Sequence, residues 1–172
     1  TTYRGEANRV LHPEQTFREG FRVAGDDLVH RVVSAIVIPR LQESIEQSGG
    51  RYVAEKMREL FGGDRGGQDQ PAVQRRRQFS VRVLIPLAEA ILAQSEGSEE
   101  FERIDLHPSS VLGFEVPEEP ASDTEPEEYT SPEVLGYLER AAAECGAEGW
   151  HLADMVLSTS REDVDAISRE VF

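Results

Sequence analysis

The chain has 172 residues, and its 33 acidic and 18 basic side chains give a formal net charge of −15 at pH 7. A mean hydropathy of −0.46, together with the lack of any apolar run near the roughly 18–20 residues that a spanning helix needs, excludes a membrane-spanning protein. The excess of acidic residues also argues against a nucleic-acid-binding protein, because affinity for phosphate comes from Lys and Arg.

The first segment, residues 2–23, is predicted to be extended, because its last part alternates apolar and polar side chains. This pattern ends at Gly25, where we expect a turn and then a helix capped by Asp26 or Asp27. A strand that leads through a glycine into a helix N-terminus presents free backbone amides to an anion. Gly25, Asp26 and Asp27 are therefore the candidate ligand-binding residues, although a capped turn without a ligand is the favoured interpretation.

The helix after this turn carries an apolar stripe from Leu28 to Val37 and then meets a proline. A proline inside a helix removes a hydrogen bond and crowds the preceding turn. We therefore expect either a kink at Pro39 or a second helix from Pro39 through Gln47. The sequence Ser-Gly-Gly at residues 48–50 is predicted to end it.

Two more amphipathic helices follow, a short one at residues 51–61 and the longest one at residues 72–94, with a glycine-rich loop at residues 62–70 between them. Pro86 is expected to bend the longer helix. Its Ile-Pro-Leu phrase resembles the Ile-Pro-Arg-Leu phrase at Pro39, but two short matches are too few to establish an internal repeat.

The remaining elements are predicted to be strands at residues 102–106 and 111–116, a helix from Pro132 to about residue 145, a strand at residues 150–157 and a last helix. The helix at Pro132 has a strong start, since a serine, a proline and an acid stand in order. Ser160 to Asp163 resembles a capping box with Asp in place of the usual Glu, and it opens the last helix.

The negative charge is concentrated in the second half of the chain: residues 1–94 have a net charge of +2 and residues 95–172 one of −17. Glu115 to Glu128 is the densest stretch and also holds three prolines, so we expect an exposed loop or tether there. A docking site for a basic partner is the alternative interpretation of this stretch.

We therefore predict an α+β fold in which a small antiparallel sheet packs with several helices. The chain is divided into three parts: strands plus a helical core at residues 1–106, an acidic Pro/Glu-rich loop at residues 107–131, and a helix-strand-helix segment at residues 132–172. Because the chain begins in a β-prone segment and stops on an apolar helical one, we expect a piece of a longer protein.

Familiar catalytic motifs are missing from the sequence, which has no GxxxxGK[ST], GxGxxG, HExxH, CxxC or GxSxG. The four histidines lack the spacing of metal ligands. Cys145 lies beside acids that are expected to raise the pKa of its thiol, so a partly buried structural role is favoured. We assign no catalytic and no metal-binding residue, and without paired catalytic groups an enzyme of unrecognised type is disfavoured.

The basic residues are 17 arginines and one lysine, and three arginines stand together at Arg75-Arg76-Arg77, with Arg82 farther along the same predicted helix. One interpretation is a phosphate or nucleotide contact. The other is the solvated start of a long helix, because three adjacent side chains point in three directions around a helix.

The first residues of the chain are polar and lack the apolar core of a signal peptide. Cys145 is the single cysteine, so no disulfide can form within the chain. We therefore expect a cytoplasmic protein, with neither nucleic acid nor a membrane among its partners.

A family resemblance lies in the stretch FREGFRVAGDDLVHRV, residues 17–32. It resembles a segment of the actin-like ATPases, including the DnaK-type chaperones, in which a strand, a glycine-containing turn and an acidic helix start follow the second phosphate-binding hairpin. Within that group the amino-acid sequence of this stretch is most similar to the SrfB family, large bacterial proteins described as virulence factors. The acidic DxG phosphate loops and the late GGxxxxP-type adenosine motif of actin-like proteins are absent from this chain.

The resemblance implies a fragment from the second lobe of an actin-like ATPase, with Gly25, Asp26 and Asp27 near the nucleotide and the helix of Arg75 to Arg82 near the purine. ATP and magnesium would then be cofactors of the full-length parent and not of this chain, and its partners would be the rest of the parent chain or other proteins. The isolated chain should not hydrolyse ATP, since positioning and charge stabilisation supply nearly all of that catalysis. The alternative is a free-standing α+β interaction module whose acidic surface binds a partner protein.

Overall fold

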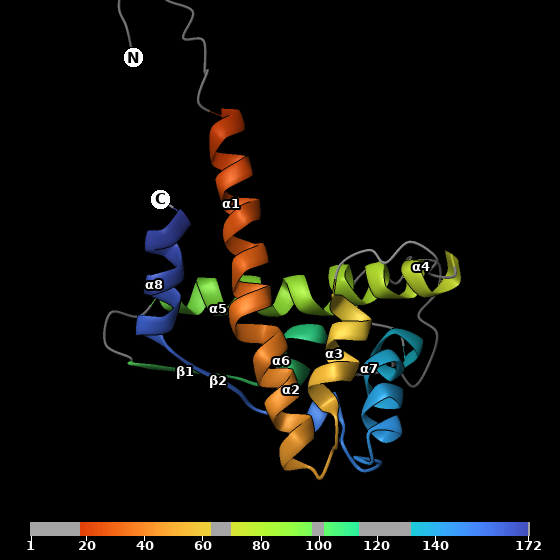
Figure 1. Cartoon of the computed structure of the whole chain (residues 1–172). Coiled ribbons are helices and arrows are strands. Elements are labelled where there is room, and N and C mark those ends of the chain that lie inside the picture. Colours follow the sequence, from red (N-terminus) through yellow and green to blue (C-terminus); the bar gives the residue numbers. More distant parts are fainter. Residues whose placement is uncertain (1–17, 63–69, 98–101, 114–131, 172) are drawn as a thin grey trace, which may run out of the picture.

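The computed structural model describes residues 18–62, 70–97, 102–113 and 132–171. Helices make up most of these residues and surround one cluster of buried apolar side chains, and two short strands form an antiparallel sheet (Figure 1). The predicted α+β class is confirmed. Within the described ranges, no helix combines the length and the apolar character needed to cross a membrane.

The first rod of the fold consists of α1 (Arg18–Val32), a five-residue π-helical turn (Val33–Val37) and α2 (Ile38–Gln47). Ile38 donates its N–H to the carbonyl of Val33, five residues back, and Pro39 follows in the first turn of α2. The wider turn displaces the carbonyl that the proline ring would otherwise crowd. The interruption predicted at Pro39 is confirmed, and it takes the form of a widened turn within one rod.

Two predictions about the start of this rod are wrong. Residues 18–23 are helical and not extended, and Gly25 lies inside α1 and not in a turn. The later part of α1 packs against α5 and α8, and the helix continues toward the N-terminus from that anchored part. One glycine in a helix interior costs only about 1 kcal/mol relative to alanine, which is too little to stop it. Residues 1–17 lie outside the described chain.

A Schellman motif ends α2, as the Ser-Gly-Gly sequence predicted. Gly50 donates its N–H to the carbonyl of Ile45 at 3.0 Å, and Gly49 donates to Glu46 at 3.0 Å. Gly49 has a φ of 96°, a left-handed conformation that glycine adopts without strain. The chain reverses here into α3 (Val53–Phe61), which confirms the predicted short helix.

A second rod consists of α4 (Gln70–Phe79), another five-residue π-helical turn (Ser80–Leu84) and α5 (Ile85–Gly97). Ile85 donates its N–H to the carbonyl of Ser80, and Pro86 follows, as in the first rod. This confirms the long helix interrupted at Pro86. The rod crosses the first one where the first π-helical turn contacts α5 (Figure 1).

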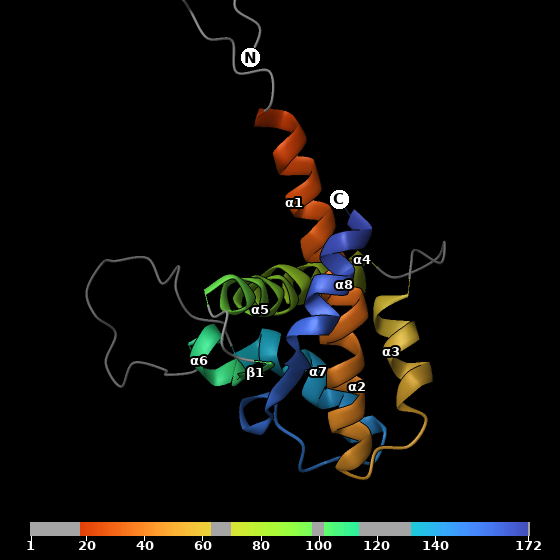
Figure 2. The ribbon, with the colours of Figure 1, turned by 90° about the vertical axis from the view of Figure 1, so that its left-hand side faces the viewer.

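The later elements are β1 (Arg103–Leu106), α6 (Pro108–Leu112), α7 (Pro132–Glu144), a short 3-10 turn (Leu152–Asp154), β2 (Leu157–Ser160) and α8 (Arg161–Val171). The two strands pair antiparallel, with Ile104 opposite Thr159 and Leu106 opposite Leu157, and these four side chains are buried. Figure 2 shows α8 beside α1, with α5 crossing the first rod.

Two of the predicted strands are wrong. Val111 and Leu112 belong to α6, because Pro108 opens a helical turn that ends at Gly113 with a φ of 57°. Residues 150–156 are not a strand: Leu152–Asp154 form a 3-10 turn, and the buried side chains of Leu152 and Met155 are three residues apart, which breaks the alternation of a strand. The strand begins only at residue 157.

The predicted capping box of the last helix is confirmed. Asp163 donates its N–H to the Ser160 Oγ at 3.1 Å, and Ser160 donates its N–H to the Asp163 carboxylate at 3.4 Å. The helix predicted from Pro132 is also confirmed as α7. Residues 114–131, which hold the acidic stretch, lie outside the described chain, so the division of the chain at residues 107 and 131 stays a prediction.

Candidate functional site

The residues predicted to bind a ligand, Gly25, Asp26 and Asp27, are exposed within α1. Free amides occur only in the first turn of a helix, and these three residues lie beyond that turn. The geometric basis for an anion site at this point is therefore absent. A contact between these residues and a nucleotide in a larger protein stays a prediction of the resemblance alone.

A different site lies where α3, α4 and α7 meet. Two adjoining hollows of about 270 and 360 Å³ share Arg75 of α4 and Tyr137 and Arg140 of α7. We call this surface the α3–α4–α7 groove. Its other lining residues are Lys56, Leu60, Gln78, Glu133, Val134, Ala141 and Glu144.

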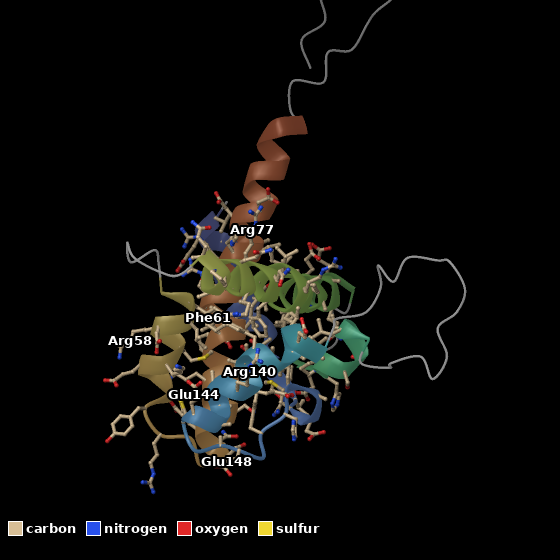
Figure 3. All side chains as sticks on the ribbon, turned by 90° about the vertical axis from the view of Figure 1, so that its right-hand side faces the viewer. Arg58, Phe61, Arg77, Arg140, Glu144 and Glu148 are labelled. Carbon is tan, nitrogen blue, oxygen red and sulfur yellow. The ribbon has the colours of Figure 1, made fainter. Side chains whose placement is uncertain are left out.

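Three aromatic rings contact one another where the helices of the groove meet. The Phe79 side chain is completely buried, and its ring centroid lies 5.5 Å from that of Tyr137 and 5.8 Å from that of Phe61. Tilted ring pairs at these separations are favourable beyond their buried area. Each of the three helices supplies one ring, so the stack fixes their relative positions (Phe61 is labelled in Figure 3).

Polar contacts join α3 to α7 at the far end of the groove. The Lys56 Nζ lies 2.7 Å from the Glu144 carboxylate and 3.3 Å from that of Glu59. Glu144 contributes most to raising the pKa of Lys56 above its ordinary value, and burial opposes it. The backbone N–H of Arg51 also donates to the carbonyl of Cys145 at 2.8 Å. Lys56 is thus already neutralised by neighbouring carboxylates.

The other two cations of the groove are not neutralised in this way. Among the described residues, the side chains of Arg75 and Arg140 form neither a hydrogen bond nor an ion pair. Tyr137 lines both hollows with them, and burial raises its pKa, although the charges of Arg76, Arg75 and Lys56 oppose that shift. Two guanidinium groups and a protonated phenol therefore face one small surface, with donors to offer.

The arginine cluster singled out in the sequence is only partly in this groove. Arg75 lines it, whereas Arg77 lines a separate hollow on the other side of α4 (Figure 3). The three side chains point in different directions, as helical geometry predicted, but they lie past the first turn of α4, which begins at Gln70. Sequence reasoning missed Arg140, although a lone arginine among so many acids was a usable signal.

A larger groove of about 760 Å³ lies between α2, the two strands and the start of α8. Its two arginines are paired already: Arg40 with Glu43 at 2.8 Å, and Arg103 with Asp105 at 2.9 Å. The Ser158 hydroxyl also bonds to Asp105, and this bond, followed by Arg103, lowers the pKa of the Asp105 carboxyl. Since both arginines already have carboxylate partners, this groove has fewer unpaired cationic donors for a ligand than the α3–α4–α7 groove.

Cys145 is half-buried at the end of α7. Burial, with a smaller effect from Glu144, raises the pKa of its thiol, in the direction that the sequence predicted. A raised pKa leaves little thiolate at neutral pH and so makes a poor nucleophile. In the described ranges, no three His, Cys, Asp or Glu side chains gather as a metal ion would require.

Comparison with known proteins gave one match. A family model described as virulence factor SrfB matches residues 1–172, the full length of the chain. No curated protein and no solved structure matches the chain. The family match therefore does not bring with it a characterised ligand or a known three-dimensional relative.

Proposed function

The chain belongs to the SrfB virulence-factor family, and we propose that it acts there as a non-catalytic docking subdomain. The observation that supports this most is the pair of guanidinium groups without ion-pair partners, Arg75 and Arg140, on two helices joined by the contact of the Phe79 and Tyr137 rings. Rigid helices that present unsatisfied donors are suited to recognising a partner.

The chemistry of the groove favours binding over catalysis. Nucleophilic and acid–base mechanisms need a nucleophile or a titratable group tuned toward neutral pH, with a partner in hydrogen-bond reach. The lining residues include no Cys, His, Ser or Asp. The raised pKa of Tyr137 moves that hydroxyl away from a role as a base at neutral pH.

A second, more specific candidate is a part of the second lobe of an actin-like ATPase. The sequence of residues 17–32 favours it, because its order of residues resembles that family. On this proposal the phosphate loops belong to the rest of the parent protein, where ATP and magnesium would bind. This chain would contribute structure and contacts, with Gly25 near the nucleotide.

Two measurements test these proposals. The chain is first titrated with MgATP by calorimetry and assayed for phosphate release; we expect neither binding nor turnover, and a turnover that Tyr137→Phe or Cys145→Ala abolishes would overturn the non-catalytic role. The chain is then co-expressed with a tagged SrfB-family polypeptide that carries the phosphate loops. Co-purification supports docking, whereas failure to co-purify at moderate salt contradicts it.

The two candidates separate in the same preparation. If the complex binds MgATP although neither polypeptide does so alone, the actin-like ATPase proposal is supported. A complex that forms and binds no nucleotide leaves the docking role intact and removes the ATPase proposal.

A further inference from the structure

We propose that the α3–α4–α7 groove uses Arg75 and Arg140 to bind a single Asp or Glu side chain of an otherwise apolar peptide segment in a partner protein. This inference rests on the proposed docking function and names the chemistry of the partner. It depends on three features of the described residues: the charge balance of the groove, its geometry, and the carboxylates at its two ends.

The charge balance matches one negative charge. Among the residues that line the groove, Lys56 pairs with Glu144, which leaves Arg75 and Arg140 against the exposed carboxylate of Glu133. The groove therefore has an excess of about one positive charge, which a single carboxylate neutralises. A phosphate dianion would leave the same surface with excess negative charge, so the carboxylate is favoured.

The donors suit a planar carboxylate. Guanidinium groups donate paired N–H groups in a rigid fork that fits the two oxygens of a carboxylate. Arg75 and Arg140 come from different helices and line the same two hollows as Tyr137, whose ring packs against the buried Phe79. A phenol, which is protonated at neutral pH, adds one more donor, and burial raises its pKa further above its ordinary value.

The two ends of the groove predict what surrounds the bound acid. Glu133 lies at one end and Glu144 at the other, so further acids next to the bound one would be repelled. Val134, Leu60 and Ala141 line the same two hollows and offer apolar contact. The favoured partner is thus an extended peptide with one Asp or Glu flanked by small apolar side chains, and not a continuous acidic run.

The test uses a short fluorescent peptide, capped at both ends, with one central glutamate among alanine and leucine residues, and a twin that has glutamine at the centre. Binding to the full chain is followed by fluorescence anisotropy at low salt and again near physiological ionic strength. We expect the glutamate peptide to bind about tenfold more tightly than its twin, as one charge-assisted contact would give. Equal affinities would overturn the proposal.

Arginine variants locate the binding. In the double variant Arg75→Gln/Arg140→Gln the preference for glutamate should disappear, whereas Arg77→Gln, on the other side of α4, should keep it. Thermal unfolding verifies that each variant is folded. If the double variant is unfolded, the two single variants replace it, and each is expected to lose part of the preference for the glutamate peptide. A preference that survives in folded Arg75→Gln and Arg140→Gln refutes the assignment of the groove.

Inorganic phosphate provides the competing outcome. Added to the bound peptide, phosphate should displace it only weakly; displacement at lower concentration than acetate requires would identify a phosphate site and overturn the carboxylate assignment. Co-purification with the loop-bearing polypeptide is measured in parallel on wild type. If that complex forms while the peptide preference is absent, this inference fails and the docking function stands.

Discussion

Replacement of Phe79 by leucine should lower the free energy of unfolding by about 1–3 kcal/mol. The substitution keeps an apolar side chain at a completely buried position, so the loss comes mainly from the two ring contacts at 5.5 and 5.8 Å. Each such pair is worth about 0.5–1.5 kcal/mol beyond its buried area. Phe79→Ala adds a cavity to this and should cost about 3–5 kcal/mol.

The assay is urea unfolding followed by circular dichroism, with thermal unfolding beside it. For a chain of this size, 2 kcal/mol corresponds to a fall of roughly 4–8 °C in the midpoint temperature. Val81→Ala is the matched control, because Val81 lies two residues along the same rod and is 51% exposed. Its change should stay within about 0.5 kcal/mol.

The ring stack also predicts a functional consequence. Phe79 supports Tyr137, so Phe79→Leu should reduce the preference of the groove for a glutamate peptide in protein that is still folded. A Phe79→Leu protein as stable as wild type would refute the claim that the rings hold α3, α4 and α7 together. If Phe79→Leu lowers stability but the preference for the glutamate peptide is unchanged, the ring contacts stabilise the fold without influencing binding in the groove.

Three further predictions concern caps, glycines and pH. Ser160→Ala removes the hydroxyl that caps α8 and should cost about 0.5–2 kcal/mol in urea unfolding. Gly50→Ala should lower the free energy of unfolding by about 1–3 kcal/mol, since the new Cβ would lie 2.8 Å from the Ile45 carbonyl oxygen. Gly136→Ala should raise it by about 0.5–1 kcal/mol, because the space around Gly136 in α7 is open. A Gly50→Ala protein more stable than the Gly136→Ala protein would contradict this packing. Glu144 raises the pKa of Lys56, so folding favours the charged form of this lysine. The ion pair therefore contributes fully to the free energy of unfolding below the ordinary lysine pKa, and this contribution is lost as the pH rises through the pKa in the folded state. Lys56→Met should therefore lower stability by about 0.5 kcal/mol at neutral pH and make no difference at strongly alkaline pH, and a loss that persists there would show that packing is responsible.

The helical frame was predictable because its signals are local. The apolar stripes, the prolines at residues 39 and 86, and the glycines at residues 49 and 50 each act within a few residues of their own position. The capping box at Ser160 is likewise complete within four residues. Such features need no knowledge of which segments meet in space, so they can be derived from sequence alone.

The start of the chain and the groove were not predictable in the same way. Alternation just before Gly25 mimicked a strand over a few residues, whereas the helix is decided by the packing of its later part against α5 and α8. The groove depends on Lys56, Arg75 and Arg140, which come from three helices. Only the tertiary arrangement shows that these cations converge, and only its ion pairs show which of them are neutralised.

The two Ile-Pro phrases, too short to establish a repeat by sequence, produce the same local structure twice. In each, the isoleucine donates to a carbonyl five residues back and the proline follows at once. In the second rod, the helical segments before and after this widened turn make different contacts. Before it, α4 contacts α7 and carries Arg75; after it, α5 contacts α1, α6 and β1 in the core. The proline thus separates the groove-bearing half from the half that anchors it, which allows α4 to present a binding surface while the rod stays fixed at its other end.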